Sequence, residues 1–242
     1  MNIEQFMKKI YEFETAYFPT ELSIDGITIR NKVSRQYEDN TIRDKYLLNG
    51  EINETVVAWK TGTLVEDLST GNYKISMDNE KKTIKGYRVN INRQELQKYL
   101  EFVDKIWDDH NLSEKKFWDI FQSLVESETK IPDGFGTVYI INLIYFKSKG
   151  NWPIYDKYAH KALKAIYFGR RPYEIWIPGA PGKTIITKKN GIVANKEVNC
   201  MYSEYLWLLD EIFGGHDYET MHGRLIDRAL WVYGHATEEY EE

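Results

Sequence analysis

The sequence is almost without cysteine: Cys200 is the only one among 242 residues. A single cysteine excludes a disulfide within the chain, and it excludes an iron–sulfur cluster held by four cysteines. Disulfides accumulate in oxidising compartments, whereas one unpaired thiol is typical of a protein kept in a reducing one. The cysteine content therefore predicts a cytoplasmic protein.

Long hydrophobic runs are also missing. The best candidate, Val138–Phe146, is about half the roughly 20 residues that a membrane-spanning helix needs. The first residues, Met1–Gln5, lack the basic-then-apolar layout of a secretory signal peptide. We expect a soluble cytoplasmic protein that makes no membrane contact. With 42% hydrophobic residues, the chain can bury a sizeable core without metals or disulfides.

Positive charge is in deficit overall, because the formal net charge is −5. The charge is unevenly spread, however. Residues 130–197 hold twelve Lys and Arg against four Asp and Glu, whereas residues 201–242 hold two Arg against ten acids. A basic segment of this kind is typical of a surface that contacts phosphates. It is equally compatible with a basic surface that faces the acidic end of the same chain, so charge alone leaves both readings open.

Apolar periodicity predicts a mainly α fold with minor β structure. Asn92 and Ser113 are the expected N-caps of two of the helices. The expected helices cover residues 2–17, one or two segments within 37–63, and 92–109, 114–127, 137–149, 156–168, 202–213 and 220–233. Short strands are expected within 21–31 and 72–91 and as β-like pieces at Glu174–Ile177 and Lys183–Thr187.

No internal repeat or low-complexity linker marks a domain boundary. We expect an N-terminal part, residues 1–110, that is mostly helical with short strands. Residues 111–242 form a second part that carries the motif described next. One compact unit is the alternative.

A loop between two predicted helices holds the most informative motif, Ile-Pro-Asp-Gly-Phe-Gly-Thr at residues 131–137. Gly134 and Gly136 allow positive φ and a close approach of backbone to a ligand. The helix that starts after Gly136 offers unpaired N–H groups and a positive dipole end, which favour a phosphate. Phe135 is expected to tuck under the loop. A turn with two glycines is also common between packed helices that bind nothing.

An aspartate at the start of the next helix is the second feature. Asp156 lies eighteen residues after Val138, behind a Trp-Pro-Ile-Tyr turn. Aspartate is a frequent N-cap, and this role is the simplest explanation for Asp156.

Together, the loop and the aspartate resemble the helix-hairpin-helix superfamily of DNA glycosylases, and most nearly its 8-oxoguanine branch. In that family a hairpin close to Leu-Pro-Gly-Val-Gly precedes a buried helix, and Val-Asp opens the following helix. Pro132, Gly134 and Gly136 are similar to the hairpin with one extra residue, and Tyr155-Asp156 is similar to the Val-Asp pair. The resemblance covers residues 114–168, about a quarter of the chain. It implies a helical glycosylase-like fold that binds double-stranded DNA as a monomer.

The resemblance also implies residue roles. Asp156 would be the catalytic carboxylate that stabilises positive charge on the sugar and activates water. Val138 stands where bifunctional relatives have a Schiff-base lysine, which implies a monofunctional enzyme without lyase activity. Lys130, Lys157 and Lys161 are the nearby lysines that could substitute. The hairpin residues implied to hold the DNA backbone, where a monovalent cation could also bind, are Pro132, Gly134, Phe135, Gly136 and Thr137.

Further contacts are expected around this motif. A flipped base needs flat side chains on either side, and Trp59, Trp152 and Tyr155 are the candidates, although each could equally be a core residue. Lys149, Arg170 and Arg171 are candidate phosphate contacts, although each could be an ordinary surface charge. No Asp, Glu or His cluster has metal-ligand spacing, so no metal is expected. The base-reading surface is expected within residues 1–110.

Several functions remain open at this stage. The default is a repair glycosylase that excises an 8-oxoguanine-like base. A glycosylase acting on hypermodified phage bases in phage defence is an alternative. A non-catalytic helix-hairpin-helix protein that binds duplex DNA is another, and a wholly structural helical protein with a coincidental turn is the last.

Overall fold

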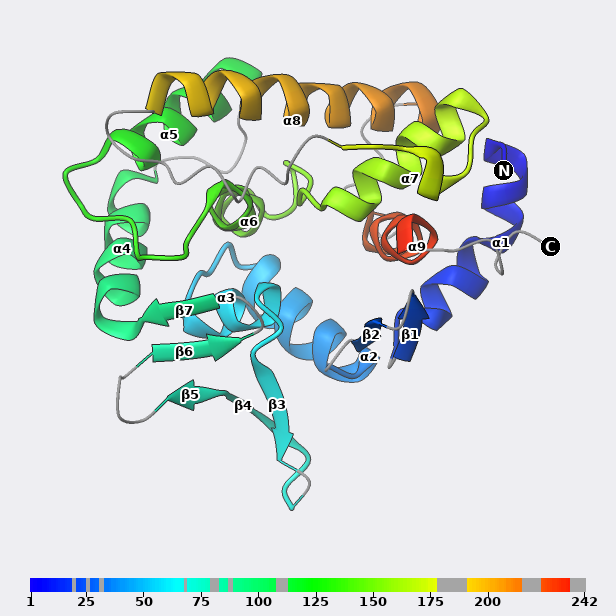
Figure 1. Ribbon diagram of the computed structural model, residues 1–242. Helices are drawn as coiled ribbons and strands as arrows, with labels where there is room; N and C mark the ends of the chain where they lie inside the picture. Colours follow the sequence, from blue (N-terminus) through cyan, green and yellow to red (C-terminus); the bar gives the residue numbers. More distant parts are fainter. Residues whose placement is uncertain are drawn as a thin grey trace. The chain divides into compact units, whose positions relative to one another are not determined.

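The computed structural model describes most of the chain, which folds mainly into helices with a few short antiparallel strands, as the sequence predicts (Figure 1). The described residues are 1–18, 21–24, 27–30, 33–67, 69–78, 83–86, 89–107, 113–177, 191–214 and 223–235. No helix within these ranges is both long and apolar enough to cross a membrane.

The chain divides into two compact units, each built from separate stretches of sequence. Unit 1 comprises residues 1–31, 155–180 and 198–242, and unit 2 comprises residues 32–154 and 181–197. The expected boundary near residue 110 falls inside unit 2. N-terminal and C-terminal segments therefore share unit 1.

Unit 1 is a small helical assembly. Its elements are α1 (Ile3–Ala16), the hairpin β1 (Glu21–Ile24) and β2 (Ile27–Arg30), α7 (Lys157–Phe168), the 3-10 turn η2 (Pro172–Glu174), the C-terminal part of α8 (Gly191–Phe213), and α9 (Gly223–His235). The expected helices are confirmed, although α8 begins well before residue 202. No strand forms at Glu174–Ile177, where a β-like piece is expected: the 3-10 turn covers Pro172–Glu174, and the backbone of Ile175 after it is extended but unpaired in any sheet. The piece at Lys183–Thr187 lies outside the described residues.

Helix α1 is fixed at its start by a capping box. The Asn2 side chain accepts the Gln5 N–H at 2.9 Å, and the Gln5 side chain accepts the Asn2 N–H at 2.8 Å. Phe6 and Phe13 lie on one face, and their rings pack 5.9 and 5.6 Å from the ring of Tyr233 on α9. The apolar stripe of the sequence is thus the contact between α1 and α9.

Helix α9 also crosses α7 at very short range. A Cβ atom built on Gly234 would stand 1.9 Å from the backbone carbonyl oxygen of Tyr158. No side chain fits at that position, because the obstructing atom belongs to the α7 backbone. Small residues on α7, such as Ala159 and Ala162, are fully buried in the same unit. Glycine and alanine therefore set the spacing of the two helices.

A buried ion pair joins the two ends of the sequence. Arg228 on α9 donates from Nη1 to Oε1 of Glu14 on α1 at 2.9 Å, and both side chains are almost fully buried. The Arg228 guanidinium also lies over the ring of Phe18, 4.7 Å from its centroid. Burial of two charges is tolerated here because each satisfies the other.

Replacing one member of this pair should cost more than replacing both. Glu14→Leu or Arg228→Met alone leaves an uncompensated buried charge, which should lower the free energy of unfolding by about 3–5 kcal/mol. The double variant should cost clearly less than either single one. Urea denaturation of the four proteins measures the cycle, and additive single-variant costs would show that the pair is not coupled.

Unit 2 combines helices with small sheets. Its described elements are α2 (Arg35–Tyr37), the π-helix η1 (Glu38–Leu47), α3 (Glu54–Lys60), β3 (Leu64–Asp67), β4 (Asn72–Ile75), β5 (Met77–Asp78), β6 (Thr83–Gly86), β7 (Val89–Asn92), α4 (Arg93–Ile106), α5 (Glu114–Glu126) and α6 (Thr137–Lys147). Strands β3 and β4 form one antiparallel ladder, and β5, β6 and β7 form another.

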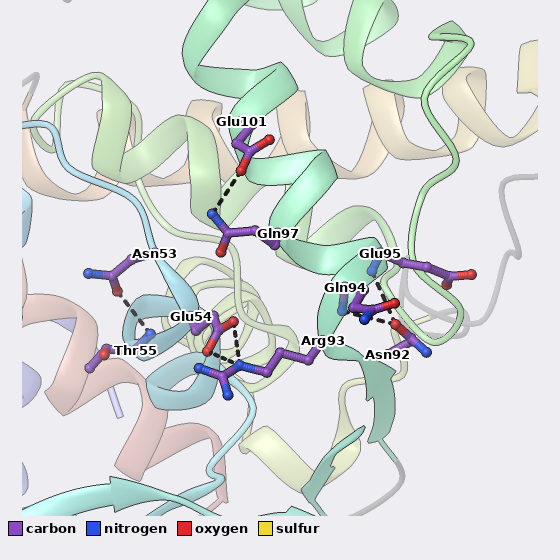
Figure 2. Close-up of polar contacts among 9 residues, drawn as sticks. All are labelled: Asn53, Glu54, Thr55, Asn92, Arg93, Gln94, Glu95, Gln97 and Glu101. Atoms are coloured by element: carbon purple, nitrogen blue, oxygen red, sulfur yellow. Dashed lines mark hydrogen bonds and ion pairs between the residues drawn. The ribbon is translucent and has the colours of Figure 1, made fainter. Parts of the chain in front are cut away.

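Asparagine side chains start two of these helices. Asn53 accepts the N–H groups of Thr55 and Val56 at the start of α3, and Asn92 caps α4 in the same way, as expected for Asn92. Glu54 and Arg93, each the first residue of its helix, form an ion pair in which Nε of Arg93 donates to both carboxylate oxygens of Glu54 at 2.8 Å (Figure 2). Each cap stabilises the start of its own helix, and the ion pair links α3 to α4.

The core of unit 2 surrounds α6. This helix is apolar on all sides and packs against α3, α5 and η1. Its fully buried aliphatic and aromatic side chains are Ile140, Ile141, Leu143, Ile144 and Phe146. A helix that is hydrophobic all round belongs in a core. The segment that follows the Pro-Gly-Gly loop is therefore held rigidly.

One helix of unit 2 departs from the expected α geometry. Residues Glu38–Leu47 form a π-helix, within the segment where one or two ordinary helices are predicted. Long π-helices are rare, and short ones are frequent at functional sites. The first residue, Glu38, is buried and accepts a hydrogen bond from Nε1 of Trp59 at 3.3 Å. Val56, Val57 and Trp59 are core residues.

Candidate functional site

The Pro-Gly-Gly loop forms a tight turn at the end of unit 2's helix α5. The N–H of Phe135 donates to the carbonyl oxygen of Pro132 at 3.0 Å. Gly134, the third residue of this turn, has φ +81°, which a type II turn requires and glycine adopts without strain. Asp133 and Gly134 are exposed at the tip, and Pro132 is buried.

Phe135 anchors the turn, as the sequence predicts. Its side chain is buried, and its ring lies 5.7 Å from Tyr99 of α4 and 5.1 Å from Tyr139 of α6. The buried ring holds the turn against two helices while the exposed tip remains open to solvent. The loop thus has one inward side chain and an accessible backbone at its tip.

Helix α6 begins without a side-chain cap. Gly136 is its N-cap residue, has an extended backbone (φ −94°, ψ −177°), and provides no side chain to accept the first N–H groups. Gly136 therefore does not use the positive φ that glycine allows. Thr137 is fully buried, and its Oγ1 has no hydrogen-bond partner among the described residues. An uncapped helix start carries partial positive charge.

Lys130, one of the possible substitute nucleophiles, is held by carboxylates. Its Nζ lies 2.7 Å from Oε1 of Glu95 and 3.4 Å from Oδ2 of Asp133. The hydrogen bond to Glu95 raises the pKa of Lys130. A lysine attacks as the neutral amine, so this environment disfavours Lys130 as a nucleophile. Val138, on the first turn of α6, has no nucleophilic group.

Asp156 lies in unit 1 and caps α7. Its backbone is extended, and its Oδ1 accepts the N–H of Tyr158 at 2.8 Å. The side chain is half-buried. The start of a helix favours negative charge, so the carboxylate lies where the local field stabilises an anion. Asp156 is therefore the N-cap of α7, and this role is compatible with a catalytic one.

A buried polar chain flanks Asp156 on one side. The Tyr155 hydroxyl lies 3.1 Å from Nδ1 of His160, and Nε2 of His160 lies 3.2 Å from Oε2 of Glu204 on α8. Lys164 donates to Oε1 of the same carboxylate at 2.8 Å. Burial lowers the pKa of His160, and the Glu204 carboxylate offsets only part of that effect. His160 is therefore a buried histidine whose Nε2 lies close to the Glu204 carboxylate without a well-aligned hydrogen bond, and its partner on α8 is not visible in the sequence.

A second buried histidine, His235 of α9, contacts the first turn of α7. The ring of His235 stacks on Tyr158, with 3.3 Å between centroids, and its Nδ1 lies 2.8 Å from the Trp231 carbonyl oxygen. Burial lowers the pKa of His235 to about 4, while the Asp156 carboxylate acts in the opposite direction. Sequence reasoning missed this residue, because only the Gly234 crossing brings α9 to the start of α7.

The three candidate base-stacking residues are packed against protein. Trp59 is buried against Glu38 and Phe146. Trp152 stacks on Phe117 at 4.5 Å. Tyr155 is fully buried in unit 1, where its ring lies edge-on to two further tyrosines. Stacking on a base would require Tyr155 to leave this core.

The three candidate phosphate contacts are exposed, as such a role requires. Lys149 follows α6 in unit 2 and has φ +56°, the left-handed region that non-glycine residues avoid. Arg170 and Arg171 follow α7 in unit 1. Arg171 donates from Nη1 to the Tyr173 hydroxyl at 2.9 Å.

Neither a metal centre nor a relative adds to this picture. Among the described residues, no group of three or more His, Cys, Asp or Glu side chains is arranged to hold a metal ion. A monovalent cation at the hairpin would instead be bound by backbone carbonyls, and it stays a prediction. Comparison of the chain with protein-family models, with curated proteins and with solved structures finds no match.

Mild acid should destabilise the protein through His235. Its folded-state pKa of about 4 lies below the ordinary value of 6.5, so the unfolded state binds a proton first as the pH falls. His235 should lower the free energy of unfolding between pH 6.5 and 4, by about 2 kcal/mol at pH 5, and its contribution should then level off. His160, whose pKa burial also lowers, should add a loss that the His235 variant retains. Urea denaturation across this range, with His235→Gln as the control, measures the effect. If the free energy of unfolding falls as steeply with pH in the variant as in the wild type, the effect comes from a group other than His235.

Proposed function

We propose that the protein is a monofunctional DNA glycosylase that hydrolyses the N-glycosidic bond of a damaged or modified base in duplex DNA. One observation carries the proposal: a rigid, uncapped hairpin precedes a buried helix, and a carboxylate caps the next helix at the distance along the chain that the resemblance requires. The two parts lie in different units, the hairpin in unit 2 and Asp156 in unit 1.

Asp156 has the chemistry that this reaction needs. The departing base leaves positive charge on the sugar, which a nearby carboxylate stabilises electrostatically. The same carboxylate can orient or deprotonate the attacking water. Its position at the start of α7 supports this role, because the Tyr158 N–H fixes Oδ1.

The hairpin is proposed to hold the DNA backbone. The exposed tip at Asp133 and Gly134 lets backbone approach closely, and the uncapped start of α6 favours a phosphate. Pro132, Phe135 and Thr137 are buried and would act by keeping this shape. We propose that the protein works as a monomer on double-stranded DNA, with a monovalent cation at the hairpin.

Val138, at the position where bifunctional relatives have a Schiff-base lysine, supports a mechanism in which water is the nucleophile. Val138 occupies the first turn of α6, and Lys130 is engaged by Glu95 and Asp133. Strand cleavage by the protein itself is therefore not part of the proposal.

The default substrate is an 8-oxoguanine-like base, from the resemblance alone. A hypermodified phage base, and hence a role in phage defence, is the alternative. A second candidate function is non-catalytic binding of duplex DNA by the hairpin. It is favoured by the packing of Trp59, Trp152 and Tyr155, because base excision needs flat side chains that can hold a flipped base.

The Asp156→Asn variant should abolish base release. Asparagine caps helices as well as aspartate does, so the fold should persist while the charge is lost. The measurement is cleavage of duplex oligonucleotides that carry a panel of oxidised, alkylated and hypermodified bases, with and without hot alkali. Wild-type protein should give breaks only after alkali, and the variant should be slower by about two orders of magnitude or more.

The outcomes separate the candidate functions. Breaks without alkali would contradict the proposed mechanism and point to a lysine nucleophile. Duplex binding without release of any base would leave the non-catalytic interpretation. Equal rates for wild type and variant would exclude Asp156 as the catalytic group.

Lys149→Gly should weaken DNA binding while it stabilises the fold. Glycine relieves the left-handed strain of about 1–2 kcal/mol at a chain-entropy cost of about 0.5–1 kcal/mol. Loss of one phosphate contact should reduce the salt dependence of duplex affinity by about 0.9 in log–log slope. Lys149→Arg, which keeps both charge and strain, is the control. An unchanged slope in the glycine variant would show that Lys149 contacts no phosphate.

A further inference from the structure

A short segment of unit 1 exposes an unusual number of aromatic rings and arginines. It runs from the last turn of α7 through η2 to Trp176, and Trp176 is 77% exposed. The exposed aromatic and arginine side chains of this segment, here called the ring surface, are Tyr167, Phe168, Arg170, Arg171, Tyr173 and Trp176. Large rings in water are unfavourable unless something covers them.

The ring surface is held in place from below. Pro172, Ile175 and Ile177 alternate with its exposed residues and are buried, and η2 packs against α7 and α9. The aliphatic members of the segment thus point inward, and every large apolar side chain left outside is a flat ring. This pattern makes the exposure of Tyr173 and Trp176 a property of the folded segment.

Contacts within unit 1 order several of these side chains before any ligand binds. The Tyr167 ring lies edge-on to Phe168 at 5.1 Å and to Trp207 of α8 at the same distance. The Arg171 guanidinium lies 5.8 Å from the centroid of the Tyr173 ring, and its Nη1 donates to the Tyr173 hydroxyl. A ring and a cation held together in this way lose little freedom when a ligand binds.

We propose that the ring surface binds single-stranded nucleic acid. Unpaired bases stack on exposed aromatic rings irrespective of sequence, and arginines bind the phosphates between them. Bases within a duplex are already stacked and cannot use such a surface. Aromatic rings and arginines also occur in protein interfaces, so a second copy of the chain is one outcome of the test below; the adjacent exposed arginines supply the positive charge that phosphates require.

Charge limits the extent of the ring surface. Arg170 and Arg171 are exposed, whereas Glu174 accepts the Arg171 N–H at 2.9 Å. Asp210 and Glu211 follow Trp207 along α8 and would repel phosphates. We therefore place the nucleic-acid strand against Tyr173, Trp176 and the two arginines. Trp207 only packs against Tyr167. Arg170 and Arg171 are also candidate phosphate contacts for the glycosylase proposed above, whereas Tyr173 and Trp176 have no part in that proposal and distinguish the two roles.

The test is fluorescence polarisation with a labelled oligo(dT) of about 20 nucleotides and a duplex of equal length as competitor. Wild-type protein should bind the single strand in preference to the duplex in this assay. Trp176→Ala and Tyr173→Ala should each weaken the affinity for oligo(dT) by about tenfold. Tyr11→Ala removes an equally exposed ring from α1 of the same unit and should leave the affinity unchanged.

The arginines give a second readout that does not depend on the rings. Arg170→Gln with Arg171→Gln should lower the log–log salt slope by about 1.4, the value for two contacts to a single strand. Circular dichroism verifies that each variant is folded.

Three results would overturn the proposal. The first is equal oligo(dT) affinity for wild type and Trp176→Ala, and the second is an unchanged salt slope in the double arginine variant. The third is a dimer, seen by light scattering, that Trp176→Ala dissociates, because the ring surface would then be an interface between copies of the chain.

Discussion

The spacing of α7 and α9 is the constraint on which unit 1 depends. Gly234 lets the backbone of α9 meet the carbonyl of Tyr158, where any Cβ would collide. That contact lies in the first turn of the helix that Asp156 caps, and it brings His235 onto the Tyr158 ring. The absence of a side chain at Gly234 therefore positions the Asp156 carboxylate, helix α7 and His235.

Much of the fold follows from local sequence. The apolar stripes of α1, α4 and α5 and the caps Asn92 and Ser113 are read correctly, because they depend on residues a few positions apart. The π-helix at Glu38–Leu47 and the pairing of Glu14 with Arg228 are not foreseeable in this way. The pair is 214 residues apart, and no periodicity links its members.

In the candidate site, too, local features are predictable from the sequence and features that depend on distant residues are not. The hairpin turn, the buried Phe135 and the cap at Asp156 are local features, and the sequence anticipates each of them. Whether an aromatic ring faces solvent or core depends on distant elements. Tyr155 lies beside the aspartate in sequence, yet residues of α8 bury it, whereas Trp176, which no sequence motif marks, is the more exposed ring.

The division into two discontinuous units has a consequence for how the chain folds during synthesis. Residues 32–154 of unit 2 form one continuous stretch, so its helices can pack while translation continues. Helix α1 leaves the ribosome before residues 32–154, but its partner α9 is made after them. Until then the apolar face of α1 has no native cover, and such exposure favours chaperone binding or aggregation. Unit 1 therefore cannot complete its folding until α9 has emerged from the ribosome.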